Sequence, residues 1–430
     1  MDMTSAKRKI IIVDCISSSV NYINDIIREG YEPVVLNPYA GSDEERENME
    51  NLSALYFSAF SVERPTCIFA CEKYDDTLAK VKELDPVLIL PGGDDGINLA
   101  SMLSHDLGLP GNNPDNLPKM RNKLLMQKAL ADAGLRSIRS RIISGLDEAV
   151  DFYHQLGDKC VVVKPVTGAA TVGVRICSNV EELRGAVIDD LRTFGDSDES
   201  SGKVMIQEFI GGTEYIVNSV SCHGKHIVTS TYRYNKRTVP GYGAVYDYCF
   251  NVSPDSDEMK AICKYAVKVL DALGITEGAT HSEFKVDGDG AVLIEANCRL
   301  CGAMMKASWL DSFLGHHETD LVLKALLHSE SFLSGTPETI IPGKYAMIWL
   351  GILEKDTFVK ENRTVDVFGK LGSYVYEINT GNGKVYPRTI DLSTCSGLVY
   401  LVNDDLKALM DDYSYMRKVN SENPEMLYKG

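Results

Sequence analysis

The sequence lacks several features that would point to other classes of protein. No run of residues approaches the roughly 20 apolar residues that a membrane-spanning helix needs. The apolar stretch at residues 10–13 is too short for a secretory signal. Positive charge is scarce, because 44 Lys and Arg stand against 61 Asp and Glu, a net charge of −17. We therefore expect neither a membrane nor a nucleic acid as a partner.

The cysteines do not form a recognisable framework. There are eleven, an odd number, and most stand singly in apolar segments, so we expect reduced thiols and a cytoplasmic protein. The pair Cys298-x-x-Cys301 has no second close pair nearby in the sequence, which disfavours a zinc or redox site. No GxxxxGK[ST] loop occurs, and "GYGAVY" at residues 241–246 lacks the third glycine of a dinucleotide fingerprint.

What is present indicates a multidomain α/β protein. Short apolar runs at residues 9–13, 34–36 and 87–90 alternate with helical patterns, which predicts a parallel α/β domain over residues 1–118. A second domain follows over residues 119–334, and residues 335–430 alternate short strands with polar turns, typical of a separate C-terminal unit.

At the start of the second domain, one continuous helix is expected from Pro118 to Ala133, closed by Gly134, and an amphipathic helix is expected over residues 258–273. Two polar segments, residues 41–48 and 194–203, are interpreted as mobile.

The stretch "HSEFKVDGDGAVLIEANCRLCG", residues 281–302, predicts a β-hairpin that carries two glutamates. A three-residue loop at residues 288–290 would pair Glu283 directly with Glu295, whereas a two-residue loop would put Glu295 on the opposite face. The longer loop also pairs apolar residues with each other, so we favour it.

Two carboxylates placed opposite each other repel unless they share a cation. Asn297 lies on the same face, and two carboxylates with an amide oxygen are suitable ligands for Mg²⁺ and phosphate. Arg299 follows and could grip a phosphate through two hydrogen bonds. The alternative is a solvated, polar hairpin face.

Each of the other charged residues, considered alone, allows two interpretations. Lys164 ends the apolar strand "CVVVK" and is either an exposed terminus or a phosphate ligand, and the small-residue loop after it could close on phosphates through backbone N–H groups. Glu208 and Glu214, in "QEFIGGTE", are either exposed strand ends or ligands of ribose hydroxyls. Lys123 in "MRNKLL" is equally ambiguous.

The order of these pieces resembles the ATP-grasp ligase superfamily over roughly residues 85–310. The pattern of a glutamate followed by E-x-N-x-R-x-x-G is complete, from Glu283 through Glu295, Asn297 and Arg299 to Gly302. The chain is most similar to the carboxylate–amine ligases of the L-amino-acid ligase, or dipeptide synthetase, group. The resemblance implies an ATP-grasp fold with a lid subdomain at about residues 139–206.

The resemblance also implies a role for each matching residue. Glu283, Glu295 and Asn297 would hold Mg²⁺. Two ions are expected, and Mn²⁺ could replace them. Catalytic contacts to the transferred phosphoryl group would come from Arg299 and Lys164. ATP would be bound by Lys123, Lys164, Thr167, Gly168, Gly173, Glu208, Phe209, Ile210, Glu214 and Arg299. Ala169 and Ala170 depart from the Gly or Ser of many relatives and could stiffen the lid loop.

The implied reaction joins a small-molecule carboxylate to an amine through an acyl phosphate, with release of ADP and phosphate. The alternatives are an ATP-grasp carboxylase that uses bicarbonate and a non-catalytic nucleotide-binding regulator. Residues that could contact substrate are Arg233, Lys236, Arg237, Gly302 and Ala303. A solvated loop explains the three basic residues equally well. The small side chain of Ala303 suggests room for a sizeable first substrate. A homodimer is possible.

Overall fold

Four parallel strands form the N-terminal sheet, in the order β3-β2-β1-β4. The computed structural model describes residues 7–165, 174–194, 204–239 and 243–429. The runs at residues 10–13 and 34–36 are fully buried in the centre of this sheet, as expected for parallel strands covered on both faces. The prediction of an α/β fold is confirmed. The elements are β1 (Lys9–Val13), α1 (Asn21–Arg28), β2 (Glu32–Asn37), α2 (Asp43–Phe60), β3 (Thr66–Phe69), α3 (Tyr74–Glu83), β4 (Pro86–Pro91) and α4 (Gly96–Asp106).

Residues 41–48, interpreted as mobile, instead begin helix α2. The Ser42 hydroxyl accepts a hydrogen bond from the Glu45 N–H at 3.2 Å, and the Glu45 carboxylate accepts one from the Gly41 N–H at 2.7 Å. Ser42 therefore caps the helix, and the acidic first turn suits the positive end of the helix dipole. Because these local signals stabilise a helix start, the prediction for this segment was wrong. Residues 195–203 lie outside the described residues.

The single helix predicted over residues 118–133 is broken at Asn122. The structure has α5 (Leu117–Arg121) and α6 (Lys123–Asp132), with extended backbone at Asn122, where φ is −93° and ψ is 116°. The Asn122 side chain accepts hydrogen bonds from the N–H groups of Leu124 and Leu125, so it caps α6. The break places Lys123 at the first position of α6.

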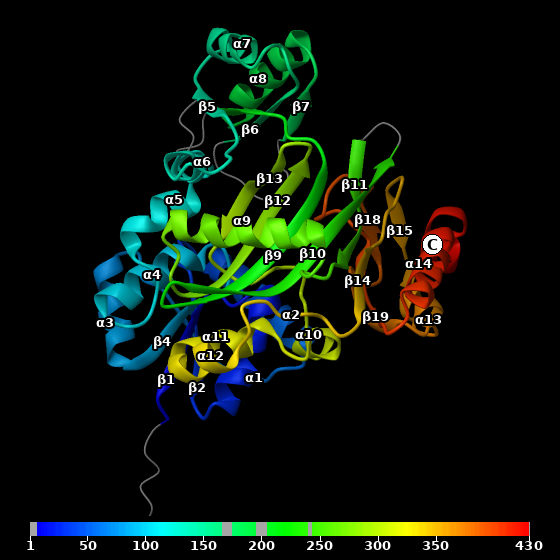
Figure 1. Cartoon of the computed structure of the whole chain (residues 1–430). Coiled ribbons are helices and arrows are strands. Elements are labelled where there is room, and N and C mark those ends of the chain that lie inside the picture. Colours follow the sequence, from blue (N-terminus) through cyan, green and yellow to red (C-terminus); the bar gives the residue numbers. More distant parts are fainter. Residues whose placement is uncertain (1–6, 166–173, 195–203, 240–242, 430) are drawn as a thin grey trace, which may run out of the picture.

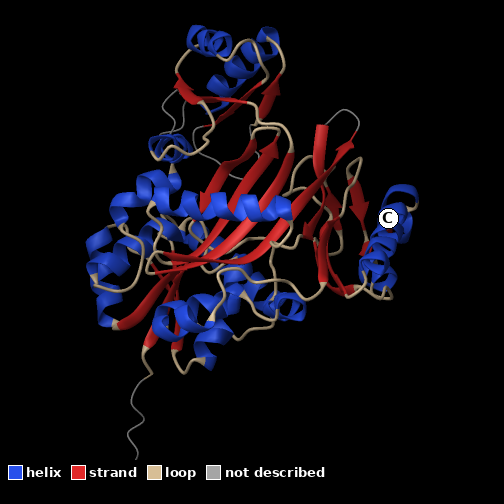
Figure 2. Ribbon diagram, viewed as in Figure 1, coloured by secondary structure: helices blue, strands red, loops and turns tan. Residues whose placement is uncertain are grey.

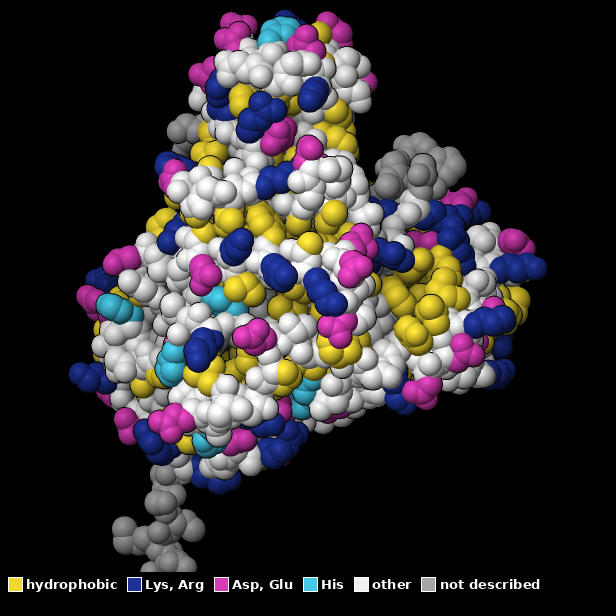
Figure 3. Space-filling model, in the orientation of Figure 1, with side chains coloured by type: hydrophobic (Ala, Val, Ile, Leu, Met, Phe, Trp, Pro, Cys, Tyr) yellow, Lys and Arg dark blue, Asp and Glu magenta, His cyan; other side chains and the backbone are white. Residues whose placement is uncertain are grey.

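A small lid projects from the rest of the molecule, as Figures 1 and 3 show. Its antiparallel sheet has the order β5-β8-β6-β7, and the helices cover one face of that sheet. The lid consists of β5 (Ser140–Ile143), α7 (Leu146–Gln155), β6 (Val161–Pro165), β7 (Arg175–Cys177), α8 (Val180–Phe194) and β8 (Val204–Glu208).

An eight-stranded sheet runs through the centre, in the order β13-β12-β9-β10-β11-β14-β19-β17. Its first five strands come from the second predicted domain. Helix α9 (Asp257–Leu273) packs on one face, as Figure 2 shows, and α10 (Ala307–Leu314) packs on the other. The strands are β9 (Thr213–Cys222), β10 (Lys225–Val239), β11 (Gly243–Asn251), β12 (Gly278–Asp287) and β13 (Gly290–Asn297). Helices α11 (Glu318–Leu327) and α12 (Ser329–Gly335) pack against the N-terminal unit.

Three strands of the C-terminal region continue the central sheet, and four others pair as two small sheets, β15-β18 and β16-β20. β14 (Tyr345–Leu350) pairs with β11, and β19 (Gly397–Asn403) and β17 (Tyr374–Asn379) follow it. This region still has a core cluster of its own, built around Trp349 and Phe368. Its other elements are β15 (Thr357–Val359), β16 (Glu361–Asn362), α13 (Thr364–Phe368), β18 (Lys384–Tyr386), α14 (Leu406–Glu422) and β20 (Tyr428–Lys429).

None of the helices in the described ranges is both long enough and apolar enough to cross a bilayer.

Candidate active site

The predicted pairing of the two glutamates is confirmed, but the structure achieves it differently. Glu283 on β12 lies opposite Glu295 on β13. The turn is the two-residue type, with Asp287 paired to Gly290, and a register shift between Glu283 and Phe284 accommodates one extra residue of β13. The predicted three-residue loop was therefore wrong. A β-bulge restores the alignment that a two-residue loop alone would have lost.

Glu295 contacts both Lys123 and Asn297 at the end of this hairpin. The Lys123 ammonium lies 2.8 Å from Glu295 Oε2, and Asn297 Nδ2 donates to Glu295 Oε1 at 3.1 Å. Burial alone raises the pKa of Glu295, but the ammonium of Lys123 holds that pKa below its ordinary value. Because the Asn297 amide uses its nitrogen here, its oxygen is left to act as a ligand.

Lys164 reaches the same cluster from the lid strand β6. Burial is the main cause that lowers its pKa from 10.5 to about 8, the positive charge of Lys123 adds to the effect, and Glu295 opposes it. Two ammonium groups and a carboxylate therefore share this site. A buried cation beside a second cation favours the approach of an anion.

Arg299 is held by a residue that the sequence did not single out. Its Nη2 lies 2.9 Å from Asp94 Oδ2, and its Nη1 donates to the Leu300 carbonyl at 2.7 Å. Asp94 belongs to the "PGGDDG" turn after β4 of the N-terminal unit and also lies 3.3 Å from Arg121. Burial opposes the change, yet the two arginines lower the pKa of Asp94. An acidic pair after a buried parallel strand was the available signal, since such edges collect functional side chains.

The residues expected to face the nucleoside lie where β8 leaves the lid. The Glu208 carboxylate accepts hydrogen bonds from the backbone N–H and the Nε of Arg139, both at 2.9 Å. The Lys285 ammonium lies 5.3 Å from the centre of the Phe209 ring and donates to the Ile210 carbonyl at 3.0 Å. Their contacts to ATP remain predictions. Thr167, Gly168 and Gly173, predicted for the lid loop with Ala169 and Ala170, lie outside the described residues.

Glu214 and Lys236, predicted for different roles, contact each other. The Lys236 ammonium lies 2.8 Å from Glu214 Oε2 and 4.4 Å from the centre of the Tyr246 ring, and the Tyr246 hydroxyl donates to Glu214 Oε1 at 2.9 Å. Glu214 is almost fully buried. A ribose that binds Glu214 must therefore compete with this lysine and this hydroxyl.

Arg233 lies on the wrong face of the sheet for the predicted role. It pairs with Tyr215, which packs in the core cluster under α9, while Tyr232 and Tyr234 on either side of it point to the opposite face. Since side chains alternate along a strand, Arg233 points away from Glu214 and Glu283. Arg237, the other arginine proposed for substrate, lies 3.8 Å from Glu354 of the C-terminal region.

Gly302 and Ala303, also predicted near substrate, belong to a segment that two domains hold. The Gly302 carbonyl accepts a hydrogen bond from the Ser18 hydroxyl at 2.8 Å, and the Ala303 carbonyl accepts one from the Tyr400 hydroxyl. Ala303 adopts a left-handed backbone with φ of +61°.

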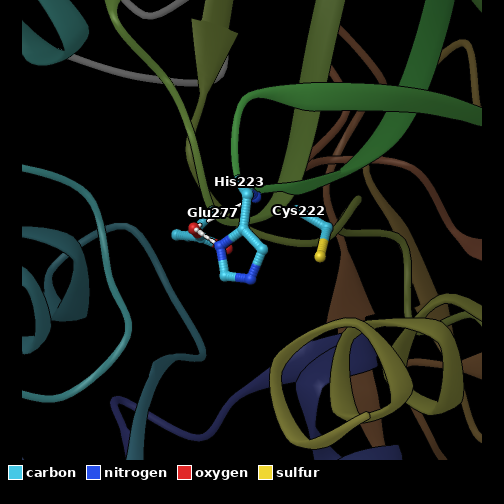
Figure 4. Close-up of side chains that lie close together, drawn as sticks. All are labelled: Cys222, His223 and Glu277. Carbon is cyan, nitrogen blue, oxygen red and sulfur yellow. Dashed lines mark hydrogen bonds and ion pairs between the residues drawn. The ribbon is translucent and has the colours of Figure 1, made fainter. Parts of the chain in front are cut away.

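Cys222, His223 and Glu277 form a second group of ligand-type side chains, at the opposite end of β9 and β12. His223 Nδ1 lies 3.0 Å from Glu277 Oε1, but Figure 4 shows the Cys222 sulfur pointing away from both. That sulfur donates to the Ala325 carbonyl at 3.3 Å, and burial raises the pKa of its thiol to about 11. A protonated thiol turned away from the pair is a poor metal ligand. This group instead fastens the β9–β10 turn to β12.

Comparison with known families agrees with the geometry of the cluster around Glu295. A profile described as "ATP-grasp domain" matches residues 158–307, which include Lys164, Glu283, Glu295, Asn297 and Arg299. The chain contains an ATP-grasp domain. The match begins in the lid and ends just after the segment at Gly302 and Ala303.

Similar proteins cover more of the chain than the domain itself. Dapdiamide A synthase of Enterobacter agglomerans is 26% identical over 351 residues, 78% of this chain and 79% of that protein. The crystal structure of an L-amino acid ligase from Bacillus licheniformis superposes with a TM-score of 0.73 and 18% identity over 96% of this chain and 98% of that one. The biotin carboxylase domain of the Hydrogenobacter thermophilus 2-oxoglutarate carboxylase, with MgADP and bicarbonate, gives 0.63 and 14% over 96% and 89%. The two structural matches establish the ATP-grasp fold.

Proposed function

We propose that the protein is an ATP-dependent carboxylate–amine ligase that forms an amide bond between an amino acid and another amino acid or related small carboxylic acid. The observation that carries the proposal is the convergence of Lys123, Lys164, Glu283, Glu295 and Asn297 from four separate elements, α6, β6, β12 and β13. Dapdiamide A synthase and the L-amino acid ligase, by their names, support the amide product over other ATP-grasp reactions.

The donor set fits a magnesium ion bound together with nucleotide phosphates. Glu283, Glu295 and Asn297 would hold Mg²⁺, since all three offer hard oxygen ligands on one face of the hairpin. When bound, Mg²⁺ would neutralise charge on the phosphates. Titration of phosphate release with Mg²⁺ and with Mn²⁺ measures the number of ions and whether Mn²⁺ can replace Mg²⁺.

The side chains of this protein would then position ATP for attack by a carboxylate. Lys123 and Lys164 would contact the phosphates, and Arg299 would stabilise the phosphoryl group during transfer and the acyl phosphate after it. Phosphoryl transfer depends mainly on such positioning and charge stabilisation, so the reaction needs no nucleophilic side chain. An amine then displaces phosphate from the acyl phosphate and leaves the amide.

The substrates would lie between this cluster and the N-terminal unit. Asp94 brings that unit to Arg299, and residues 302–303 extend from the same strand end. Arg233 is withdrawn as a substrate ligand because it lies on the other face of the sheet. We propose a cytoplasmic location, which the eleven free cysteines support.

The test is phosphate release from MgATP across pairs of amino acids and small carboxylic acids, with mass spectrometry of each positive reaction. We expect release that requires both an acid and an amine, with a product lighter than their sum by one water. Release that requires bicarbonate would establish the carboxylase alternative instead. ATP binding without release in any mixture would favour a nucleotide-binding regulator.

A further inference from the structure

A strained segment connects the proposed phosphate site to the rest of the molecule. Ala303 and Met304 are consecutive non-glycine residues with positive φ, +61° and +50°. Left-handed backbone is uncommon for such residues, and two in succession persist only where the surroundings hold them. The segment, residues 302–306, begins three residues after Arg299, so its conformation bears on the space beside that guanidinium.

The N-terminal unit holds one side of this segment with two serines. The Ser17 hydroxyl accepts a hydrogen bond from the Met304 N–H at 3.0 Å. The Ser18 hydroxyl accepts one from the Met305 N–H at 2.9 Å and donates to the Gly302 carbonyl at 2.8 Å. Ser17 is itself left-handed, with φ of +54°, so both partners in this contact have unusual backbone.

The C-terminal region holds the other side with two tyrosines. The Tyr376 hydroxyl donates to the Met304 carbonyl and accepts from the Lys306 N–H, both at 3.0 Å. The Tyr400 hydroxyl donates to the Ala303 carbonyl. The two rings stack, with centroids 4.0 Å apart and planes 7° apart, so each tyrosine fixes the other.

We propose that Tyr376 and Tyr400 are positioning residues that hold residues 302–306 in place beside the acyl site. The C-terminal region thereby helps to determine which carboxylate substrates are accepted. This role rests on the proposed ligase function, because it assigns the segment to the wall of the carboxylate subsite. Ala303 supports the link between the segment and the two tyrosines, since it packs in the same apolar cluster as Tyr376 and Tyr400. Residues on β17 and β19 would thus act on specificity from outside the ATP-grasp match, which ends at residue 307.

Replacement of each tyrosine by phenylalanine isolates the hydroxyl groups. Tyr376→Phe and Tyr400→Phe keep the stacked rings, and Tyr376→Phe also keeps the ring that lies 4.8 Å from the Lys306 ammonium. Tyr374→Phe is the matched control, because Tyr374 lies on the same strand but packs in the C-terminal core cluster.

Two measurements on the full-length protein test the proposal. The first is hydrogen exchange of the amides of residues 303–307 without ligands. The second is kcat/KM for a series of carboxylate substrates of increasing size, with KM for ATP measured in parallel. We expect the exchange rate to rise about fivefold for each hydrogen bond lost, two in Tyr376→Phe and one in Tyr400→Phe. We also expect an altered order of preference among the carboxylates, with KM for ATP within about twofold of wild type.

The outcomes separate this proposal from the proposed function. Unchanged exchange and unchanged substrate preference, in a wild-type protein that forms amides, would overturn the positioning role and leave the ligase function standing. Faster exchange with an unchanged order of preference would overturn the role in specificity, since the contacts would then be structural only. Failure of the wild-type protein to form any amide would overturn the ligase function, and with it the assignment of a carboxylate subsite.

Discussion

Replacement of Lys164 by methionine should stabilise the nucleotide-free protein while it weakens ATP binding. Burial and the neighbouring Lys123 lower the Lys164 pKa from 10.5 to about 8. At 1.36 kcal/mol for each pKa unit, that difference corresponds to an upper bound of about 3.4 kcal/mol of unfavourable free energy near pH 7. Because the side chain retains some exposure to water, we expect a gain of about 1 to 3 kcal/mol in unfolding free energy for Lys164→Met.

The pH dependence of that gain follows from which state binds the proton. Between pH 8 and pH 10.5 the unfolded chain keeps the Lys164 proton while the folded protein loses it. The wild-type protein therefore becomes more stable, relative to Lys164→Met, as pH rises through this window. The difference should be largest at pH 7 and should shrink toward zero near pH 10.5.

Urea unfolding at pH 7.0, 8.5 and 9.5, with and without MgATP, measures both effects. Lys128→Met is the control, since Lys128 lies on α6 with 65% of its side chain exposed, and it should change stability by less than about 0.5 kcal/mol. MgATP should stabilise the wild type and the control but have little effect on Lys164→Met. A Lys164→Met protein that is less stable than wild type at pH 7, or a difference that does not change with pH, would refute the reasoning.

Three further predictions concern the hairpin glutamates, Asp94 and Ala303. Glu283→Gln and Glu295→Gln should each raise the Mg²⁺ concentration needed for half-maximal phosphate release at least about tenfold. Asp289→Asn, on the exposed turn between the two strands, should leave that concentration unchanged, and equal effects of all three variants would contradict the metal role. Asp94→Asn should lower kcat about 10- to 100-fold with KM for ATP nearly unchanged, because Arg299 loses its charged partner. Asp95→Asn is the control, and a changed KM with normal kcat would argue against a role of Asp94 in positioning Arg299. Ala303→Trp should slow bulky carboxylate substrates more than small ones in the same rate assay, and equal rates for both would remove Ala303 from the substrate site.

The cluster at the end of the β12–β13 hairpin could be predicted in large part, because its signals lie within short segments, whereas its binding of phosphate stays a prediction. The hairpin of residues 281–302 brings Glu283, Glu295 and Asn297 together by strand pairing alone, and a cross-strand contact needs no knowledge of the remaining chain. The loop type was wrong because a bulge and a longer turn give the same pairing at the glutamates. Apolar matching along the strands could not separate these two solutions.

The contacts between distant segments could not be predicted in the same way. Asp94 and Arg299 are separated by 205 residues, and nothing near either one indicates the other. The face on which Arg233 lies depends on the register of β10, which contains irregularities that shift alternation along the strand. The continuation of the central sheet into the C-terminal region likewise depends on the pairing of β11 with β14, where Tyr248 lies opposite Trp349.

The ion pairs of this site suggest that ATP and metal should bind together. Lys123 forms an ion pair with Glu295, a predicted metal ligand, and Arg299 forms one with Asp94. A metal ion alone would have to displace the Lys123 ammonium from Glu295 and leave Lys123 next to Lys164 with less negative charge nearby. ATP alone would bring phosphates to two lysines but also toward Glu283 and Glu295. The two together supply both an anion for the lysines and a cation for the glutamates, so the charge arrangement of these side chains favours binding of the MgATP complex over either component.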